Sequence, residues 1–257
     1  MTSVEPSPSP AGARVLITGG TSGLGLAMAR ALVDAGAAVV LTGRDAGRAR
    51  EAAASLGGTS GAGTVHGLGV DVRDEHAVDA GVADAVDLLG GLDVAVLNAG
   101  IGMRTVNPDF LTAPQPFWAV TPDGFRDVVE TNLTGYFLTA RAAVPALRAS
   151  GGRIVVVSMN HATMRRGGFV PYGPSRAGGE SLARIMAADL GPEGVTVNVL
   201  LPGGATATGM IPEGADVAGL IDPDVMGPPI CWLASPAAAG VHDERIVATE
   251  FDWPPGR

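Results

Sequence analysis

Short apolar runs alternate with segments of helical spacing from Arg14 to near the end of the chain. The apolar runs predict strands at residues 15–18, 38–42, 64–71, 92–98, 153–158, 195–201 and 245–249. Several of these runs, such as VAVL and IVVV, are continuously apolar and do not alternate with polar positions. Such runs are typical of strands that are covered on both faces in a parallel sheet.

The segments between the strands predict helices. The first segment repeats its apolar residues at steps of three and four and ends before Gly36, a common helix stop; these residues are Leu24, Ala27, Met28, Ala31, Leu32 and Ala35. A later helix begins at Thr121-Pro122-Asp123, which provides a cap, a first-turn proline and an acid near the positive end of the helix dipole. We expect this helix to run to about Leu147, with an irregularity near Pro145.

The alternation of strands and helices along the whole chain predicts the fold class. It is an α/β fold, a Rossmann-type doubly wound parallel sheet of about seven strands with helices on both faces. Residues 1–11, MTSVEPSPSPA, are rich in Pro and Ser and carry too little apolar surface to order themselves. We therefore expect a disordered tail at 1–11 and a single domain at 12–257, with the GGTSGAG stretch at 57–63 as a loop inside it.

Composition excludes several classes of protein. No apolar run approaches 18 residues and no basic region precedes an apolar block, so we expect neither a membrane span nor a secretory signal. The net charge of -9 argues against nucleic-acid binding. The single cysteine, Cys231, cannot form an internal disulfide and fits a cytoplasmic location. All 17 basic residues are arginines, so no lysine is available for a Schiff base.

A glycine-rich loop joins the first predicted strand to the first helix. Glycines allow the backbone to turn tightly and approach a pyrophosphate, while the helix N-terminus offers free N–H groups. The spacing is TGxxxGxG and not the GxGxxG of most dinucleotide-binding folds. We interpret the loop as a dinucleotide site and not as a turn in a glycine-rich chain, and the residues that would contact the cofactor are Gly19, Thr21, Ser22, Gly23, Leu24 and Gly25.

The end of the second strand predicts which dinucleotide binds. An NAD site usually has an acid there, which accepts a hydrogen bond from the ribose 2′-hydroxyl. This chain has Gly43 followed by Arg44, and a guanidinium suits a 2′-phosphate in charge and in geometry. Arg48 is placed to assist, and the alternative is a surface arginine at a helix start beside Asp45. We therefore predict NADP(H) as the cofactor.

With these residues in view, the chain resembles the short-chain dehydrogenase/reductase family over roughly residues 13–250. The resemblance implies an adenine contact after the third strand, a cofactor-lining motif after the fourth, an active-site asparagine in the long helix and an element after the sixth strand that holds the nicotinamide carboxamide. In that order, the matching residues are Asp71-Val72, Asn98-Ala99-Gly100, Thr131-Asn132, and Pro202-Gly203 with Thr206 or Thr208.

The family's catalytic motif, Tyr-x-x-x-Lys, corresponds here to the segment from Tyr172 to Arg176. A four-residue step on a helix places both side chains on one face. The resemblance implies that Tyr172 exchanges a proton with the substrate oxygen, while the cation holds the nicotinamide ribose and lowers the tyrosine pKa. Arg176 can supply the charge and bind the ribose, but a guanidinium does not readily release a proton. The chain departs here from the family's proton relay.

The family's catalytic serine lies thirteen positions before the tyrosine, and that position is Met159 here. A thioether is a weak acceptor and no donor, so it cannot polarise a carbonyl. Asn160 has an amide donor and is our preferred replacement, because strand alternation aims Ser158 to the opposite side. Histidine side chains can serve as acid or base near neutral pH, so His161 is an alternative candidate for that role, but we favour a solvated loop histidine.

Other residues receive simpler interpretations. Tyr136 is expected to pack within the long helix, and the remaining histidines show no ligand spacing, so we predict no metal site. The loop at 101–120 carries Phe110, Phe117 and Trp118, either as a wall over an apolar substrate or as anchors to the core. The segment at 204–227 matches the family's substrate loop. Arg165-Arg166 is placed to meet an anionic group, although we favour a solvated turn.

Two functions follow from these residues. The favoured one is an NADP(H)-dependent oxidoreductase that interconverts a ketone and a secondary alcohol on a mid-sized, mostly apolar small-molecule substrate. The alternative is a protein of the same fold with redirected or lost redox chemistry, such as a non-redox enzyme, a cofactor-binding sensor or a scaffold. The resemblance also implies a homotetramer or homodimer that assembles through the helices containing Asn132 and Tyr172.

Overall fold

The computed structural model describes residues 9–57, 63–212 and 218–252. Residues 1–8 of the expected tail and 58–62 of the expected loop lie outside the described residues. The chain is already packed at Pro10, which is buried and accepts a hydrogen bond from the Ala13 N–H at 2.9 Å. The Gly12 N–H donates to the Gly36 carbonyl at 2.9 Å, so this part of the chain is held against the end of the first helix.

The described residues form a seven-stranded sheet in the order β3-β2-β1-β4-β5-β6-β7, and every neighbouring pair is parallel. This order reverses direction beside β1, as expected for a doubly wound fold. The predicted fold class is therefore confirmed. The strands are β1 (Arg14–Ile17), β2 (Ala38–Gly43), β3 (Val65–Gly69), β4 (Val94–Leu97), β5 (Arg153–Val157), β6 (Thr196–Leu201) and β7 (Arg245–Val247).

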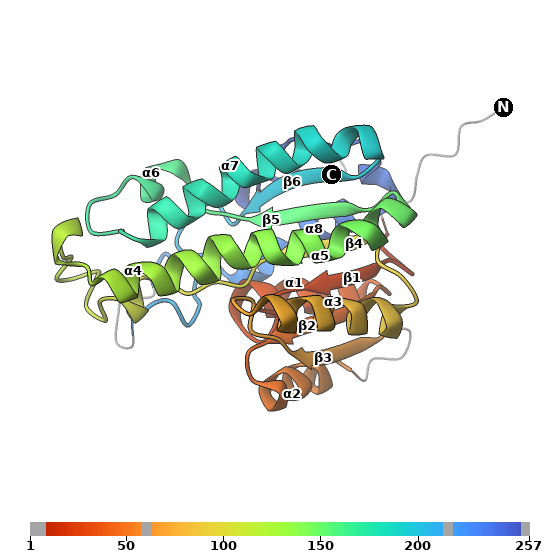
Figure 1. Cartoon of the computed structure of the whole chain (residues 1–257), viewed down its shortest axis with the longest axis horizontal. Helices are drawn as coiled ribbons and strands as arrows, with labels where there is room; N and C mark the ends of the chain where they lie inside the picture. Colours follow the sequence, from red (N-terminus) through yellow and green to blue (C-terminus); the bar gives the residue numbers. More distant parts are fainter. Residues whose placement is uncertain (1–8, 58–62, 213–217, 253–257) are drawn as a thin grey trace.

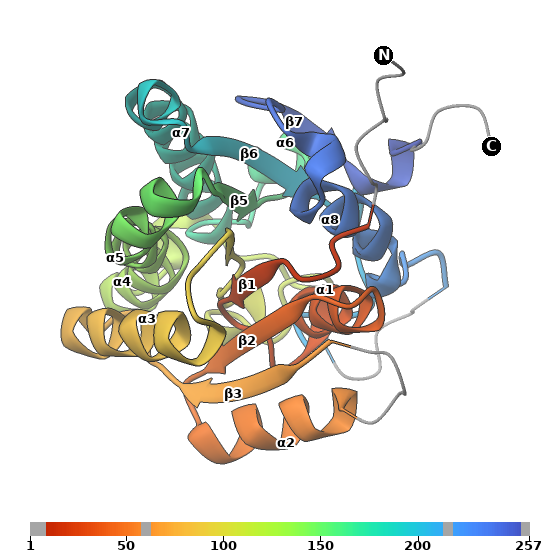
Figure 2. The ribbon, with the colours of Figure 1, turned by 90° about the vertical axis from the view of Figure 1, so that its right-hand side faces the viewer.

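Helices cover both faces of this sheet (Figures 1 and 2). One face packs against α1 (Gly23–Asp34), α2 (Ala46–Leu56) and α8 (Gly227–Ala234). The other face packs against α3 (Glu75–Leu89), α5 (Gly135–Ser150) and α7 (Tyr172–Leu190). The continuously apolar strands supply side chains to both layers; in β4, Val94 and Val96 belong to the first and Ala95 and Leu97 to the second.

The long helix departs from α geometry at a different place from the one predicted. Thr121 caps it by accepting from the Gly124 N–H, and α4 (Pro122–Val129) then passes through a π-helical turn, η3 (Glu130–Thr134), into α5. Pro145 lies inside α5, which continues to Ser150. The irregular turn of this helix is therefore at residues 130–134 and not, as predicted, near Pro145. A proline removes a single N–H donor, whereas a π turn inserts an extra residue into the helix. That turn contains Asn132.

The carboxyl ends of the parallel strands share one edge of the sheet, and the candidate site lies there. The loops after β1, β4, β5 and β6 all start from this edge. Figure 1 shows α4, the short helix α6 (His161–Met164) and the start of α7 together at one end of the molecule. The fold therefore brings together residues that are far apart in the sequence.

Candidate active site

The glycine loop after β1 is packed so closely that side chains cannot replace its glycines. A Cβ on Gly19 would lie 2.7 Å from the Ala99 Cα, and Gly19 has a φ of +65°, which favours glycine. A Cβ on Gly25 would lie 2.3 Å from the Gly19 carbonyl oxygen. Ser22 precedes α1 without capping it through its side chain, so the first N–H groups of that helix have no side-chain partner from Ser22. We call the loop from Gly19 to Gly25 the glycine cradle, because its backbone N–H groups can act as hydrogen-bond donors.

Asn98 holds the glycine loop against the end of β4. Its Nδ2 donates to the carbonyls of Thr18 at 2.9 Å and Gly19 at 3.0 Å. The Thr18 hydroxyl in turn accepts from the N–H groups of Asn98 and Ala99. The Asn98 amide nitrogen therefore shapes the glycine loop by holding its backbone carbonyls.

The segment after β6 reaches the same cradle. A Cβ on Gly23 would lie 3.1 Å from the Thr208 Cγ2, so Thr208 faces the loop. Thr206 is buried, and its hydroxyl donates to the Gly204 carbonyl at 3.2 Å. Pro202 accepts from the Thr249 N–H at 3.3 Å, and Gly203 takes a φ of +104°. Of the two threonines considered from the sequence, Thr208 is the one beside the glycine loop.

The end of β2 presents a free cation. Arg44 is exposed and forms no ion pair within the described part of the chain. Asp45 does not compete for it directly, because its carboxylate caps α2 by accepting from the Arg48 N–H at 2.7 Å. Gly43 lies against the glycine loop, since a Cβ there would be 2.6 Å from the Thr21 Cγ2. Arg44 is therefore positioned at the border of the cradle.

The expected adenine contact is also ordered by packing and charge. Hydrogen bonding from the Arg73 guanidinium lowers the pKa of Asp71 below its ordinary value, with an ion-pair distance of 2.7 Å. Val72 is buried, and a Cβ on Gly135 would lie 2.8 Å from its Cγ2. Asp71 is thus an ionised group close to Arg44, and the positive charge of Arg44 adds to the lowering of its pKa.

Asn132 ties three elements together from the π turn. Its Oδ1 accepts from the Ile101 N–H at 2.8 Å, and its Nδ2 donates to the Ile101 carbonyl at 3.0 Å and to the Ser175 hydroxyl at 3.1 Å. The side chain is completely buried. Asn132 therefore locks the segment after β4 and the first turn of α7, which carries Tyr172, into one arrangement.

Arg176 is buried beneath the site and points between the two tyrosines of the chain. It is 4% exposed, its Nη1 contacts the Tyr136 hydroxyl and donates to the Val157 carbonyl at 3.1 Å, and its Cζ lies 5.2 Å from the Tyr172 ring centroid. A Cβ on Gly100 would lie 2.4 Å from its Nη2. Burial alone would lower the pKa of Arg176, but attraction to the two phenol oxygens raises it above its ordinary value. Arg176 remains a cation.

Tyr136 is a residue that the sequence interpretation assigned only to packing. Its hydroxyl donates to the Val157 carbonyl at 3.0 Å and also contacts Arg176 Nη1, and burial raises its pKa. No signal in the sequence points to this role, because Asn132 lies in the π turn η3 and the four-residue spacing of a regular α-helix does not apply between Asn132 and Tyr136.

Met159 belongs to an apolar cluster that surrounds Tyr172. We call this the methionine–aromatic cluster, and it consists of Met103, Val106, Phe110, Met159, Phe169 and Tyr172. Phe110 and Phe169 pack edge to face with centroids 5.6 Å apart. The Tyr172 hydroxyl donates to the Met210 Sδ at 3.7 Å, so the phenol oxygen faces a sulfur and apolar groups.

The three aromatic residues of the loop at 101–120 lie in different environments. Phe110 is buried in the methionine–aromatic cluster, where it forms a wall beside Tyr172. Phe117 and Trp118 are 66% and 76% exposed and pack edge to face against each other with centroids 5.3 Å apart. They are therefore neither core anchors nor part of the pocket wall.

A charged network holds the backbone that carries Met159. Arg245 Nη2 donates to the Met159 carbonyl at 2.8 Å, and its Nε donates to Glu180 at 3.1 Å. Glu180 also accepts from the Ser158 hydroxyl at 2.6 Å and contacts His161 Nε2 at 3.0 Å. Burial would raise the pKa of Glu180, but these hydrogen bonds and the Arg245 charge lower it. His161 is thus bound to a carboxylate, which the expected solvated loop histidine did not include.

Asn160 has a local structural role. Its Oδ1 accepts from the Thr163 N–H at 2.9 Å, which caps α6. The amide nitrogen is the part of the side chain that remains for the donor role expected from the sequence. Within the described residues no group of three or more His, Cys, Asp or Glu side chains is arranged to hold a metal ion, and no helix is long and apolar enough to cross a membrane.

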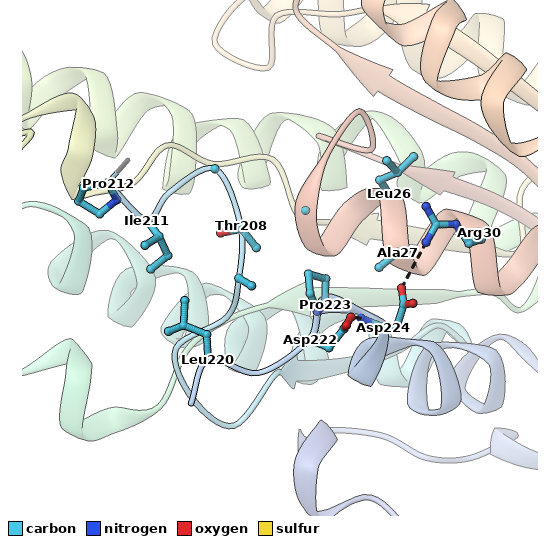
Figure 3. Close-up of a pocket in the computed structure, with 13 residues that line it drawn as sticks. Leu26, Ala27, Arg30, Thr208, Ile211, Pro212, Leu220, Asp222, Pro223 and Asp224 are labelled. Atoms are coloured by element: carbon cyan, nitrogen blue, oxygen red, sulfur yellow. Dashed lines mark hydrogen bonds and ion pairs between the residues drawn. The ribbon is translucent and has the colours of Figure 1, made fainter. Parts of the chain in front are cut away.

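A cavity of about 630 Å³ borders the glycine loop on its α1 side (Figure 3). Leu26 and Ala27 of α1 line one wall, and Thr208 and Ile211 of the segment after β6 line the opposite one. Arg30 and Asp224 form an ion pair at 3.5 Å across it. The segment expected as the substrate loop therefore forms a wall of this cavity, and residues 213–217 of that segment lie outside the described residues.

The fold and the site define a doubly wound α/β protein with a glycine-rich loop after β1 and a buried arginine, Arg176, that lies between two tyrosines. Comparison with known proteins agrees, because the family model described as short chain dehydrogenase matches residues 13–216. The chain belongs to the short-chain dehydrogenase/reductase family of oxidoreductases.

Similar proteins show the range of this resemblance. The 3-oxoacyl-[acyl-carrier-protein] reductase MabA of Mycobacterium avium is 31% identical over 190 residues, which cover 74% of this chain and 66% of that protein. The first three curated relatives are matched over 66%, 63% and 48% of their lengths, so the match spans less than two thirds of each.

Two of the solved structures that resemble this chain are complexes with a nicotinamide cofactor. A short chain dehydrogenase from Burkholderia cenocepacia in complex with NADP has a TM-score of 0.80 and 27% identity, over 93% of this chain and 97% of that one. The 3-ketoacyl-(acyl-carrier-protein) reductase from Brucella melitensis, complexed with NADH, has a TM-score of 0.79 and 28% identity over the same shares. These neighbours bind different dinucleotides.

Proposed function

We propose that this protein is an NADP(H)-dependent oxidoreductase that interconverts a ketone and a secondary alcohol on a mid-sized, mostly apolar substrate. The observation that carries the proposal is the setting of Tyr172. Its hydroxyl faces the methionine–aromatic cluster and Met210, while the buried cation of Arg176 lies 5.2 Å from its ring. A proton donor in an apolar pocket beside a fixed positive charge suits the interconversion of a carbonyl and an alcohol.

The residues present fit a nicotinamide dinucleotide. The cradle formed by Gly19 and Gly25 leaves no room for a Cβ, and the first turn of α1 offers N–H groups to a pyrophosphate. Thr208 faces this cradle from the segment after β6, and Gly100 lies against Arg176, because a Cβ on Gly100 would be 2.4 Å from the Arg176 Nη2. When bound, the nicotinamide ring supplies or accepts the hydride.

Tyr172 handles the proton. In reduction its Oη donates a proton to the substrate oxygen, and in oxidation the phenolate takes that proton back. Arg176 stabilises the phenolate electrostatically and does not pass on a proton, because its guanidinium stays charged. The apolar side chains packed against Tyr172 lower the local polarity, which strengthens this interaction. Asn132 keeps Tyr172 in place through Ser175 and Ile101.

We expect NADPH to bind roughly ten- to a hundredfold more tightly than NADH, because a charge-assisted hydrogen bond to the 2′-phosphate contributes ~1.5–3 kcal/mol. Arg44→Ala should remove most of this preference while leaving NADH affinity within about twofold. Fluorescence titration of each cofactor measures the effect. Arg50→Ala is the matched control, because it removes the same charge from an exposed position further along α2. Equal affinities for the two cofactors in the unmodified protein would contradict the assignment of NADP(H).

The substrate pocket is tested at Met159. We expect NADPH consumption to be fastest with ketones that carry apolar groups, and Met159→Ser to lower kcat/KM on those ketones by about tenfold, because a hydroxyl in an apolar cluster loses ~1–3 kcal/mol. Met159→Leu should retain most of the activity, since it keeps the apolar volume. The measurement is kcat/KM across a panel of ketones of graded size. A gain from Met159→Ser on every ketone would rule out a pocket built around the thioether.

A second candidate function is cofactor binding with redirected or lost redox chemistry. One observation favours it: Arg176 is committed to Tyr136 and Val157 beneath the site and is 4% exposed, so little of it faces a ribose. The same ketone panel discriminates between the two functions. Tight NADPH binding without consumption on any ketone or alcohol would favour the second.

A further inference from the structure

The Tyr136 hydroxyl occupies a junction between three elements. It projects from α5, donates to the Val157 carbonyl at the end of β5 at 3.0 Å, and contacts Arg176 Nη1 from α7. Arg176 Nη1 also donates to the Val157 carbonyl, at 3.1 Å. The three groups therefore form a closed triangle of hydrogen bonds in which Tyr136 contributes the only side-chain oxygen.

Arg176 has few other partners in this buried position. Its Nε has no hydrogen-bond partner, and no carboxylate forms an ion pair with it among the described residues. Glu180, one turn further along α7, is committed to Ser158, His161 and Arg245. The titratable groups that face the guanidinium are thus the phenols of Tyr136 and Tyr172. A buried cation without a carboxylate depends on the polar groups that remain.

We propose that Tyr136 is a positioning residue for the reaction, because its hydroxyl fixes the Arg176 guanidinium beside the Tyr172 ring. The inference rests on the proposed function in one respect, the role of Tyr172 as the proton donor. Tyr136 does not touch the substrate in this arrangement. It acts through Arg176, whose Cζ lies 5.5 Å from the Tyr136 ring centroid and 5.2 Å from that of Tyr172.

The geometry explains why the hydroxyl matters more than the ring. A phenylalanine at 136 would keep the aromatic face above the guanidinium but would remove the oxygen that holds Nη1. The Val157 carbonyl would keep Arg176 as a donor, so no acceptor would be left unpaired. The Arg176 Nη1 would then be held by the Val157 carbonyl alone, and the guanidinium would occupy more positions around Tyr172. The Tyr172 phenolate would lose part of its stabilisation.

The effect is measured on Arg176 itself and on turnover. In the nitrogen-15 NMR spectrum of the cofactor-free protein, the side-chain signal that disappears in Arg176→Lys is assigned to the Arg176 Nε–H. We expect this signal to broaden in Tyr136→Phe, because the guanidinium loses one of the two oxygens that hold Nη1. At neutral pH, kcat should fall about tenfold, with KM for NADPH changed by less than about threefold.

Thr139→Val is the matched control. It removes another buried hydroxyl of α5, one that donates to the Gly135 carbonyl at 2.8 Å, and it should leave the Arg176 signal unchanged. Should Tyr136→Phe fail to fold, Arg176→Lys serves as the second variant. It keeps the charge but not Nη1, the nitrogen that reaches both Tyr136 and Val157, and kcat should again fall about tenfold; an unchanged kcat would overturn the inference. When both variants fold, the effect of Tyr136→Phe on kcat should vanish in the Arg176→Lys background.

The outcomes separate this inference from the proposed function. An Arg176 signal in Tyr136→Phe that matches the one in the unmodified protein overturns the positioning role, whatever the enzyme activity. A broadened signal together with no NADPH consumption on any ketone supports the positioning of Arg176 and contradicts the proposed reaction. The same broadening in Thr139→Val also overturns the inference, because it would assign the effect to a general loosening of α5.

Discussion

Tyr172→Phe should lower kcat for ketone reduction by ~10²–10⁴-fold, the usual contribution of a general acid. The change removes a single oxygen and leaves the ring in the methionine–aromatic cluster, so the pocket and the fold should persist. The affinity for NADPH should stay within about threefold, because the glycine cradle does not involve Tyr172. Stopped-flow rates and fluorescence titration with NADPH measure the two quantities on the same preparation.

The other tyrosine provides the comparison for this experiment. Tyr136→Phe makes the same chemical change at a position that does not touch the substrate, and its expected loss is about tenfold. The difference between the two variants therefore isolates the direct proton transfer. Retention of most activity in Tyr172→Phe on the true substrate would show that another residue is the acid. A loss equal to that of Tyr136→Phe would reduce Tyr172 to a positioning role.

The architecture could be predicted because its signals are local and repeated. Continuous apolar runs such as β4 and β5 indicate strands covered on both sides, and helical spacing between the strands implies parallel connections. The helix ends follow from single residues: Thr121 caps α4, and Gly151 ends α5 with a φ of +64°. Parallel strands also share one carboxyl edge, which places the motifs after β1, β4 and β6 on the same side of the sheet.

The orientation of long side chains could not be predicted in the same way. An arginine has many rotamers, and sequence alone does not show that Arg176 turns inward to Tyr136 and Val157. The decisive partner lies 40 residues away, on another helix. The π turn around Asn132 is similar, because a one-residue insertion within a helix has no clear signal in composition.

The network behind Met159 was missed for a related reason. Arg245 lies on β7 and Glu180 on α7, 65 residues apart, and each reads as an ordinary charged residue in the sequence. Only the packing of β7 beside β6 brings Arg245 to the Met159 carbonyl. Asn160 differs because the sequence identified it as a candidate donor in the segment after β5. In the structure, its side-chain oxygen caps α6, which is a local role.

The glycine cradle supports the other large prediction, because a side chain added at Gly25 would collide with a backbone oxygen of the loop. A Cβ on Gly25 would lie 2.3 Å from the Gly19 oxygen and 2.5 Å from the Asn98 Nδ2. Neither group can rotate away: Asn98 is bonded to the carbonyls of Thr18 and Gly19, and Gly19 is packed on Ala99. The start of α1 must therefore move away from the loop, although alanine favours a helix by about 1 kcal/mol over glycine.

Gly25→Ala should therefore lower NADPH affinity by about a hundredfold or more, since displacing the loop weakens charge-assisted bonds of ~1.5–3 kcal/mol each. Overpacking also destabilises the fold by roughly 1–3 kcal/mol, a fall in Tm of about 2–10 °C. Cofactor titration and thermal unfolding measure the two effects. Gly167→Ala is the control, because a Cβ there has no atom within 4 Å, and both quantities should be unchanged. If Gly25→Ala binds NADPH as tightly as the unmodified protein, the cradle is not the cofactor site.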